Sequence, residues 1–346
     1  MDDGRPIELR SDNSAGAAPE ILAALIDANQ GSALAYGGDE VTSRLTALVR
    51  DVFEHSTAEV FPVSTGTAAN AVALSALTPP WGAVLCHETA HIIVNEGGAT
   101  SMFSGGAVMA GLTGPDFTIA PESLIAALES VGWGDPHHSQ PAVLSLTIPS
   151  DYGTITPPDQ IARLAAIARQ RGLKVHIDGA RIANAIAALG CAPADLTWRA
   201  GVDVFSLGAI KNGAVSTDAI VSFDPVASGH LMYRTKRAGQ VASKMRFQSA
   251  QLIAYLTDGL WLRLAGDANR TMARLAEGLD RLGVEMVNRV DANMLFVKLP
   301  EPVIGRLEES GLLFYRIGPG LIRFVTSFQS SDDDMDVALS RIAGSL

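Results

Sequence analysis

The sequence feature that most constrains the fold is a pair of short, mostly apolar segments that each end in a charged residue beside glycine. Residues 175–177 lead into Asp178, and Arg181 follows closely. Residues 206–210 lead into a single lysine, Lys211, with glycines on both sides. In α/β proteins ligands bind at the carboxyl ends of strands, where side chains are held rigidly. The two segments therefore predict strands that carry Asp178 and Lys211 to one edge of a sheet.

A carboxylate and an amine held in this way suit a pyridoxal phosphate enzyme. The cofactor needs a carboxylate that keeps its pyridine nitrogen protonated, and a lysine amine that bonds covalently to its aldehyde. Asp178 and Lys211 are the candidates for these roles. Taken singly, Asp178 also fits the cap of a helix that begins near Ala180, and Lys211 fits a solvated loop residue. The other motifs of the chain favour the cofactor site.

Strand and helix patterns alternate along most of the chain. The expected strands include residues 60–63, 83–87, 141–148 and 219–223, and the expected helices residues 19–29, 41–53, 69–77, 121–130, 157–171 and 251–264. This alternation predicts an α/β fold with a parallel sheet. From about Asp267 the order changes to helix, strand, helix and strand, with strands at residues 294–297 and 321–326. The predicted division is an N-terminal segment (1–15), a large domain (16–265) and a small C-terminal domain (266–346).

The composition limits the partners of the chain. Hydrophobic residues make up 47% of the 346 residues, charged residues 18%, and the net charge is −11. The low charged fraction indicates oligomerisation, and the acidic balance excludes a nucleic-acid partner, which needs clustered Lys and Arg. With no apolar run of 18 residues and a polar, acidic start, we expect no membrane span and a cytoplasmic protein. Cys86 and Cys191 lack zinc spacing and are expected to be buried free thiols, so no metal site is expected.

A turn of small residues, 64–67, lies between the strand at 60–63 and the helix expected from Ala69. Backbone amides at the start of the helix, the Thr67 hydroxyl and the positive end of the helix dipole can bind a phosphate dianion without a lysine. Such turns are common, so this segment alone is weak evidence. It matches neither the P-loop nor the dinucleotide fingerprint.

Further candidates for ligand contacts follow from their positions. His87 and His91 lie four residues apart, but no third metal ligand is evident nearby, so we prefer a single functional histidine, His91, that stacks on a planar ring. A structural histidine is the alternative. Arg323 lies inside an apolar strand, where it needs an anion, either a substrate carboxylate or a structural Asp or Glu. Tyr36 lies on an exposed glycine turn and either packs locally or reaches a ligand.

The order and spacing of these motifs resemble the low-specificity L-threonine aldolases, which are β-eliminating lyases among the fold-type I pyridoxal phosphate enzymes. The resemblance covers nearly the whole chain. It is carried by Arg10–Asp12, Tyr36–Asp39, Thr65–Asn70, Cys86–His91, Asp178–Arg181, Lys211–Gly213, Arg246–Phe247, Ala250–Gln251 and Ile322–Arg323. It implies a large domain with a mostly parallel seven-stranded sheet, a smaller α+β domain, and a homotetramer built as a dimer of dimers with shared active sites.

The resemblance also implies a role for each candidate residue. Lys211 bonds the cofactor, Asp178 pairs with its pyridinium, Gly66 and Thr67 bind its phosphate, and His91 stacks on its ring. Ser11, Arg181 and Arg323 bind the substrate carboxylate, with Arg181 also beside the cofactor, and Tyr36 is an active-site residue near the subunit boundary. The catalytic residues are expected to be Lys211, His91 and Asp178.

The implied reaction cleaves an L-β-hydroxy-α-amino acid to glycine and an aldehyde. L-Threonine and L-allo-threonine are the expected substrates, with phenylserine as a further candidate. The alternatives are a β-eliminating or other amino-acid lyase of the same fold, since fold does not determine chemistry, and a non-catalytic protein that binds the cofactor. The chain departs from the family at Ser150–Asp151, where relatives often have Thr-Glu. The general base is left open among His91, a bound water and the phosphate side of the site.

Overall fold

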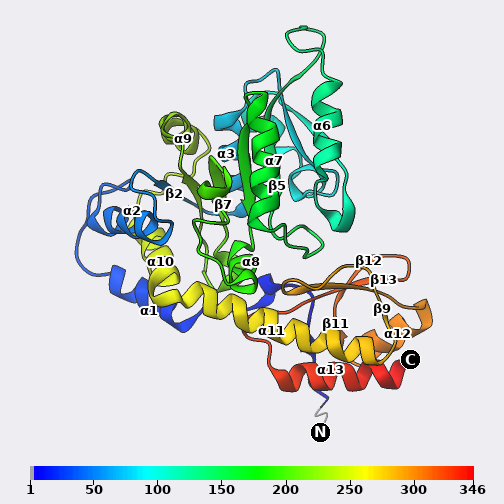
Figure 1. Cartoon of the computed structure of the whole chain (residues 1–346). Coiled ribbons are helices and arrows are strands. Elements are labelled where there is room, and N and C mark those ends of the chain that lie inside the picture. Colours follow the sequence, from blue (N-terminus) through cyan, green and yellow to red (C-terminus); the bar gives the residue numbers. More distant parts are fainter. Residues whose placement is uncertain (1–3) are drawn as a thin grey trace.

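The computed structural model describes residues 4–346 and has a large part built on a seven-stranded sheet and a small part built on a four-stranded sheet (Figure 1). Residues 1–3, which belong to the predicted N-terminal segment 1–15, lie outside the described residues. None of the helices formed by residues 4–346 combines the length and the apolar character that a bilayer crossing requires.

The large sheet has the strand order β2-β8-β7-β6-β5-β3-β4. Its strands are β2 (Glu59–Val63), β3 (Gly82–His87), β4 (Val108–Leu112), β5 (Gln140–Thr147), β6 (Lys174–Gly179), β7 (Val204–Leu207) and β8 (Asp218–Ser222). Strands β7, β6, β5, β3 and β4 pair in parallel, while β8 pairs antiparallel with both of its neighbours. The prediction of a mostly parallel seven-stranded sheet is confirmed.

Helices cover both faces of this sheet. They are α1 (Pro19–Ala28), α2 (Glu40–Val52), α3 (Gly66–Leu77), α4 (His91–Val94), α5 (Ala99–Ser104), α6 (Pro121–Glu129), α7 (Pro158–Gln170), α8 (Ile182–Leu189), α9 (Pro225–Arg237), α10 (Arg246–Leu256) and α11 (Leu260–Arg281). Because side chains alternate along a strand, Val175 and Ile177 of β6 enter the core beside α7 and α8. Asp178 points to the opposite face, where it meets α3.

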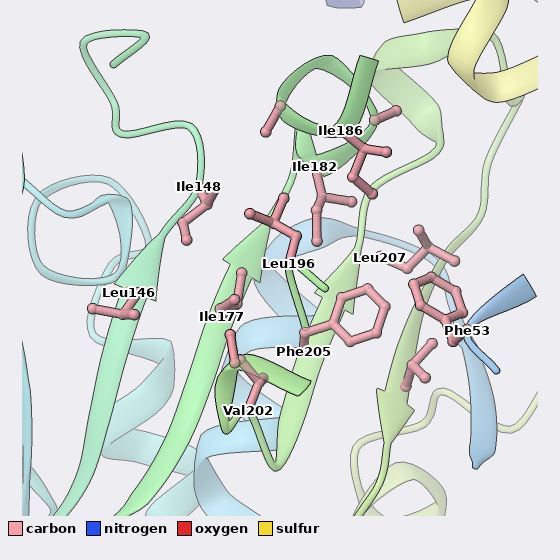
Figure 2. Close-up of a cluster of buried hydrophobic side chains, with 14 of the residues drawn as sticks. Phe53, Leu146, Ile148, Ile177, Ile182, Ile186, Leu196, Val202, Phe205 and Leu207 are labelled. Atoms are coloured by element: carbon pink, nitrogen blue, oxygen red, sulfur yellow. The ribbon is translucent and has the colours of Figure 1, made fainter. Parts of the chain in front are cut away.

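Aromatic rings fill the core between the sheet and the helices at one side of the large part. The ring of Phe53 lies 5.1 Å from that of Phe205 and 6.2 Å from those of Phe223 and Trp261, measured between centroids. Figure 2 shows Phe53 and Phe205 facing each other among the aliphatic side chains of this cluster. Strand β6, which carries Asp178, and strand β7, which precedes the turn with Lys211, therefore pack against a well-filled core.

The small part is an antiparallel sheet with two helices. Its strands, in the order β12-β13-β10-β9, are β12 (Tyr315–Gly318), β13 (Leu321–Val325), β10 (Met294–Lys298) and β9 (Glu285–Met286), and its helices are α12 (Glu301–Glu309) and α13 (Asp332–Ser345). Strand β1 (Ile7–Glu8) pairs in parallel with β11 (Leu312–Leu313). The N-terminal segment is thereby anchored to the C-terminal part of the chain.

The structure corrects the helix expected at residues 251–264. Two helices, α10 and α11, are separated by the turn Thr257–Gly259, in which Asp258 and Gly259 adopt left-handed φ values of 51° and 69°. These conformations are incompatible with a continuous helix. Helix α11 also crosses the proposed domain boundary at residue 265 and continues along α13 (Figure 1). The division into domains stays a prediction.

The expectation that both cysteines are buried free thiols is corrected for one of them. Cys86 is buried, as expected, but Cys191 is partly exposed. It follows α8 and packs only at the margin of the main core.

We predict that Phe205→Ala lowers the free energy of unfolding by about 3–5 kcal/mol, because it leaves a cavity among packed rings. Chemical denaturation measures this change. Val226→Ala is the matched control, since that side chain is 68% exposed and its truncation should change the free energy by less than about 0.5 kcal/mol. Equal changes in the two variants would contradict the packing described for this core.

Candidate active site

Two adjoining cavities lie at the carboxyl ends of the parallel strands. The inner cavity has a volume of about 310 Å³, and the outer one of about 700 Å³. Gly66, Thr67 and Asp178 line only the inner cavity, Ser11 and Arg323 only the outer one. His91, Arg181 and Lys211 line both cavities, together with Asn13 and Asp151. The structure thus brings together every predicted site residue except Tyr36.

Lys211 is held by its backbone rather than by its side chain. It lies in the short turn η4 (Ile210–Asn212), where Asp218 Oδ1 accepts hydrogen bonds from the amides of Ala209 and Ile210 at 2.7 and 3.0 Å. Among residues 4–346, no hydrogen-bond or ion-pair partner meets the Lys211 amine. The positive charge of Arg181, followed by burial, lowers the pKa of Lys211. A lowered pKa leaves more of the amine neutral and nucleophilic.

Asp178 ends β6 with its side chain almost completely buried. Its Oδ1 accepts a hydrogen bond from the Ala180 amide at 3.0 Å, and its Oδ2 accepts one from Asn70 Nδ2 at 2.9 Å. Helix α8 begins only at Ile182, so Asp178 supports the turn before the helix rather than capping the helix itself. The carboxylate still faces the inner cavity.

His91 is the first residue of α4 and is tied to two carboxylates. Its Nδ1 lies 2.9 Å from Glu96 Oε1, and its backbone amide donates to Asp151 Oδ2 at 2.9 Å. The hydrogen bond with Glu96 is the main cause that raises the pKa of His91. His87 instead contacts Thr89. Within residues 4–346, no group of three or more potential metal ligands is present.

Asn70 of α3 connects Asp178 with Glu96, the partner of His91. Its Nδ2 donates to Asp178 Oδ2 at 2.9 Å and to Glu96 Oε1 at 2.8 Å, while its Oδ1 accepts from Ser206 Oγ at 2.7 Å. All its side-chain hydrogen-bonding groups are thereby used within a buried network. Sequence reasoning included Asn70 in a motif without giving it a role, because its partners lie far away in the chain.

The start of α3 provides an anion-binding end for the inner cavity. The helix begins at Gly66, three residues earlier than expected, and Thr65 caps it by accepting a hydrogen bond from the Ala68 amide at 3.1 Å. The first amides of a helix have no partner within the helix. Gly66 and Thr67 therefore offer amides beside the cavity, with the positive end of the helix dipole behind them.

The two arginines expected to bind a carboxylate differ in their surroundings. Arg181 is paired with buried Asp12, at 2.6 Å from Nε to Oδ2 and 2.9 Å from Nη2 to Oδ1. Arg323 meets no Asp or Glu within residues 4–346; its Nη2 donates to the Arg10 carbonyl at 3.2 Å, and its buried Nε has no partner there. Arg323 thus has no carboxylate partner among the described residues, whereas Arg181 already has one; the binding of a substrate carboxylate by either arginine stays a prediction.

Ser11 and Tyr36 complete the predicted set. Ser11 lines the outer cavity and also caps the following turn, since its Oγ accepts from the Asn13 amide. Tyr36 lines neither cavity. Its ring is exposed, and the Lys236 amine lies 4.6 Å from the ring centroid. Local packing into the core is thus excluded for Tyr36, and its role at a subunit boundary stays a prediction.

We predict that Asn70→Ala lowers the free energy of unfolding by about 1–3 kcal/mol, because two buried carboxylates lose a donor. It should also raise the pKa of His91, since Glu96 then accepts from the imidazole without competition; an NMR titration measures this. The control Ser206→Ala removes the bond to Asn70 Oδ1 and a 3.5 Å contact with His176 Nε2, but it keeps both donors of Asn70. It should leave the His91 pKa within about 0.3 units. Unchanged His91 titration in both variants would refute the coupling.

Comparisons with known proteins agree with this arrangement. The model of the β-eliminating lyase family matches residues 8–302. The low specificity L-threonine aldolase of Pseudomonas aeruginosa is 41% identical over 327 residues, which cover 93% of each chain. The low specificity L-threonine aldolase of Escherichia coli is 26% identical over 340 residues, which cover 95% of this chain and 96% of that protein. The match extends along nearly the full length of these relatives.

Solved structures share the fold. A threonine aldolase of Leishmania major superimposes with a TM-score of 0.90 at 24% identity and covers 96% of this chain and 97% of its own. A serine palmitoyltransferase of Sphingomonas wittichii superimposes with a TM-score of 0.75 at 18% identity, over 99% of this chain and 88% of its own. These likenesses confirm the expected fold-type I architecture. The chain belongs to the β-eliminating lyase family, in the group of the low specificity L-threonine aldolases.

Proposed function

We propose that this protein is a pyridoxal 5'-phosphate-dependent aldolase that cleaves L-β-hydroxy-α-amino acids to glycine and an aldehyde. L-Threonine, L-allo-threonine and phenylserine are the proposed substrates. The observation that carries the proposal is that the amine of Lys211, which has no hydrogen-bond or ion-pair partner within residues 4–346, shares one cavity with the carboxylate of Asp178. The relatives named L-threonine aldolase support the choice of reaction.

The residues of the inner cavity fit pyridoxal phosphate. Lys211 would bond its aldehyde, Asp178 would pair with its pyridine nitrogen, the amides of Gly66 and Thr67 would hold its phosphate, and His91 would cover the ring. A bound pyridoxal phosphate withdraws electrons from the substrate α-carbon, which allows a bond at that carbon to break. The absence of any protein partner for the Lys211 amine, among the described residues, is the feature that best matches this cofactor.

The outer cavity then orients the substrate. Arg323, which has no carboxylate partner among the described residues, binds the substrate carboxylate, with Ser11 lining the same cavity. The carboxylate of Asp12 fixes Arg181, whose charge keeps the Lys211 amine available as a nucleophile. A rigidly held carboxylate decides which bond of the α-carbon stands in line to break.

The assembly and the location of the protein belong to the same proposal. We infer a homotetramer, built as a dimer of dimers, in the cytoplasm. Exposed Leu34 and Tyr36 support a subunit boundary at this segment, because they are 75% and 59% accessible in the single chain. Tyr36 would then reach the active site of a neighbouring copy. Size-exclusion chromatography with light scattering tests the tetramer.

A second candidate function is β-elimination, which the description of the matching family favours. The products distinguish the two. Glycine and an aldehyde support aldol cleavage, whereas a 2-oxo acid and ammonia support elimination. We expect glycine with acetaldehyde from L-threonine.

We predict that Lys211→Ala abolishes the covalent attachment of pyridoxal phosphate and reduces aldehyde release below detection, because no other amine takes its place. Borohydride reduction followed by mass spectrometry measures the attachment. Lys298→Ala is the control, since Lys298 is exposed and pairs with Glu285. Cofactor attached to the protein at full yield in Lys211→Ala would remove Lys211 from this role.

We predict that Arg323→Ala raises the KM for L-threonine about 10- to 100-fold and spares cofactor binding, because a charge-assisted hydrogen bond is worth about 1.5–3 kcal/mol. Steady-state kinetics measure the KM. Arg316→Ala, on the same sheet but paired with Glu301 and Glu308, is the control. An unaltered KM in Arg323→Ala would exclude Arg323 from carboxylate binding.

A further inference from the structure

Asp151 is an acidic residue in the candidate site that has no role in the proposal so far. It follows β5 and lines both the inner and the outer cavity. Its Oδ2 accepts the hydrogen bond from the His91 amide at 2.9 Å. Its Oδ1 has no hydrogen-bond partner among residues 4–346. One carboxylate oxygen thus fixes the side chain, and the other is free to contact a ligand.

The surroundings of Asp151 suit a proton acceptor that works near neutral pH. Burial, and then the charge of Asp178, raise the pKa of Asp151 to about 6, against smaller opposing effects of His91 and Arg181. The charged and titratable groups that face it are His91, Asp178, Arg181, Arg323 and Cys86. A base is most effective when its pKa lies close to the working pH.

The other groups of the site are committed to different tasks. Glu96 Oε1 lies 2.9 Å from His91 Nδ1, and this hydrogen bond raises the pKa of His91, which favours the protonated imidazole over a role as base. Asp178 accepts two hydrogen bonds, and both oxygens of Asp12 are bound by Arg181. Among residues 4–346, Asp151 is the carboxylate that lines both cavities and keeps an oxygen without a hydrogen-bond partner; Glu96 Oε2 also has no partner, but Glu96 lines only the inner cavity.

We propose that Asp151 is a catalytic residue that accepts the β-hydroxyl proton of the substrate. This inference rests on the proposed aldol cleavage. The proton passes to Asp151 Oδ1, the electrons of the O–H bond form the C=O bond of the aldehyde, and the Cα–Cβ bond breaks. Its electron pair remains on the α-carbon, which the cofactor stabilises, and protonation of that carbon then gives glycine. No oxidant or further reactant is needed.

Relatives often have Thr-Glu where this chain has Ser150–Asp151, so Asp151→Glu is a conservative variant with which to test the inference. Asp151→Glu keeps the carboxylate but lengthens the side chain by one methylene. Asp151→Asn keeps the size and removes the basicity. Asp280→Asn, on the exposed side of α11, is the matched control. Asp151→Asn tests the need for the carboxylate charge, Asp151→Glu tests the length of the side chain, and Asp280→Asn tests whether the position of the carboxylate matters.

The experiment compares two reactions of the cofactor-loaded enzymes. Aldehyde release from L-threonine requires removal of the β-hydroxyl proton, whereas exchange of the glycine α-hydrogen with deuterium, followed by NMR, does not. We expect Asp151→Asn to lose aldehyde release by about 10²- to 10⁴-fold and to keep glycine exchange within about threefold of wild type. Asp151→Glu should regain part of the aldehyde release, and Asp280→Asn should match wild type in both reactions.

The pH dependence gives a second measure. The base acts when deprotonated, so wild-type kcat should fall as the pH drops below about 6, and the residual activity of Asp151→Asn should lack this fall. Parallel losses of both reactions in Asp151→Asn would overturn the assignment in favour of a structural role, and unaltered aldehyde release would overturn it outright. If wild type exchanges glycine but cleaves no β-hydroxy amino acid, the proposed function itself is wrong.

Discussion

The active site depends on one buried side-chain amide, that of Asn70, which donates hydrogen bonds to two carboxylates. Asn70 donates to Asp178 and to Glu96 with the same nitrogen, at 2.9 and 2.8 Å. Two acids packed close together would repel each other in a medium of low dielectric constant unless donors compensate them. The Asn70 amide supplies these donors without adding a charge. It thereby joins Asp178, the carboxylate proposed to pair with the cofactor nitrogen, and Glu96, the hydrogen-bond partner of His91, in one network.

The two arginines of the site, Arg181 and Arg323, have different partners. Asp12 accepts hydrogen bonds from Nε and Nη2 of Arg181, which fixes the guanidinium at the wall of both cavities. This charge disfavours protonation of Lys211, in keeping with the need for a neutral nucleophile. Arg323, supplied by the small sheet, keeps its binding capacity. One arginine therefore lowers the pKa of the Lys211 amine, and the other is the one proposed here to bind the substrate carboxylate.

The sequence allowed the scaffold to be predicted but not its long-range pairs. Asp178 and Lys211 were predictable because a strand end followed by small residues is a local pattern. The pairing of Arg181 with Asp12 joins residues 169 positions apart, and that of Asn70 with Asp178 joins residues 108 positions apart; no local pattern tells which carboxylate meets which donor. The break before α11 was overlooked although Asp258–Gly259 is a common turn pair. Tyr36 could not be placed because its expected partner lies outside this chain.

The pairing of β1 with β11 has a consequence for the biogenesis of the enzyme. Arg10, whose carbonyl receives the Arg323 guanidinium, is separated from it by 313 positions, and Ser11 and Asp12 follow on the same anchored segment. During synthesis these residues are made long before β11, so β1 can pair only after residues 312–313 have been added. Contacts of such high sequence separation close late. The main sheet, whose strands lie between residues 59 and 222, can thus form before residues 10–12 are anchored beside Arg323.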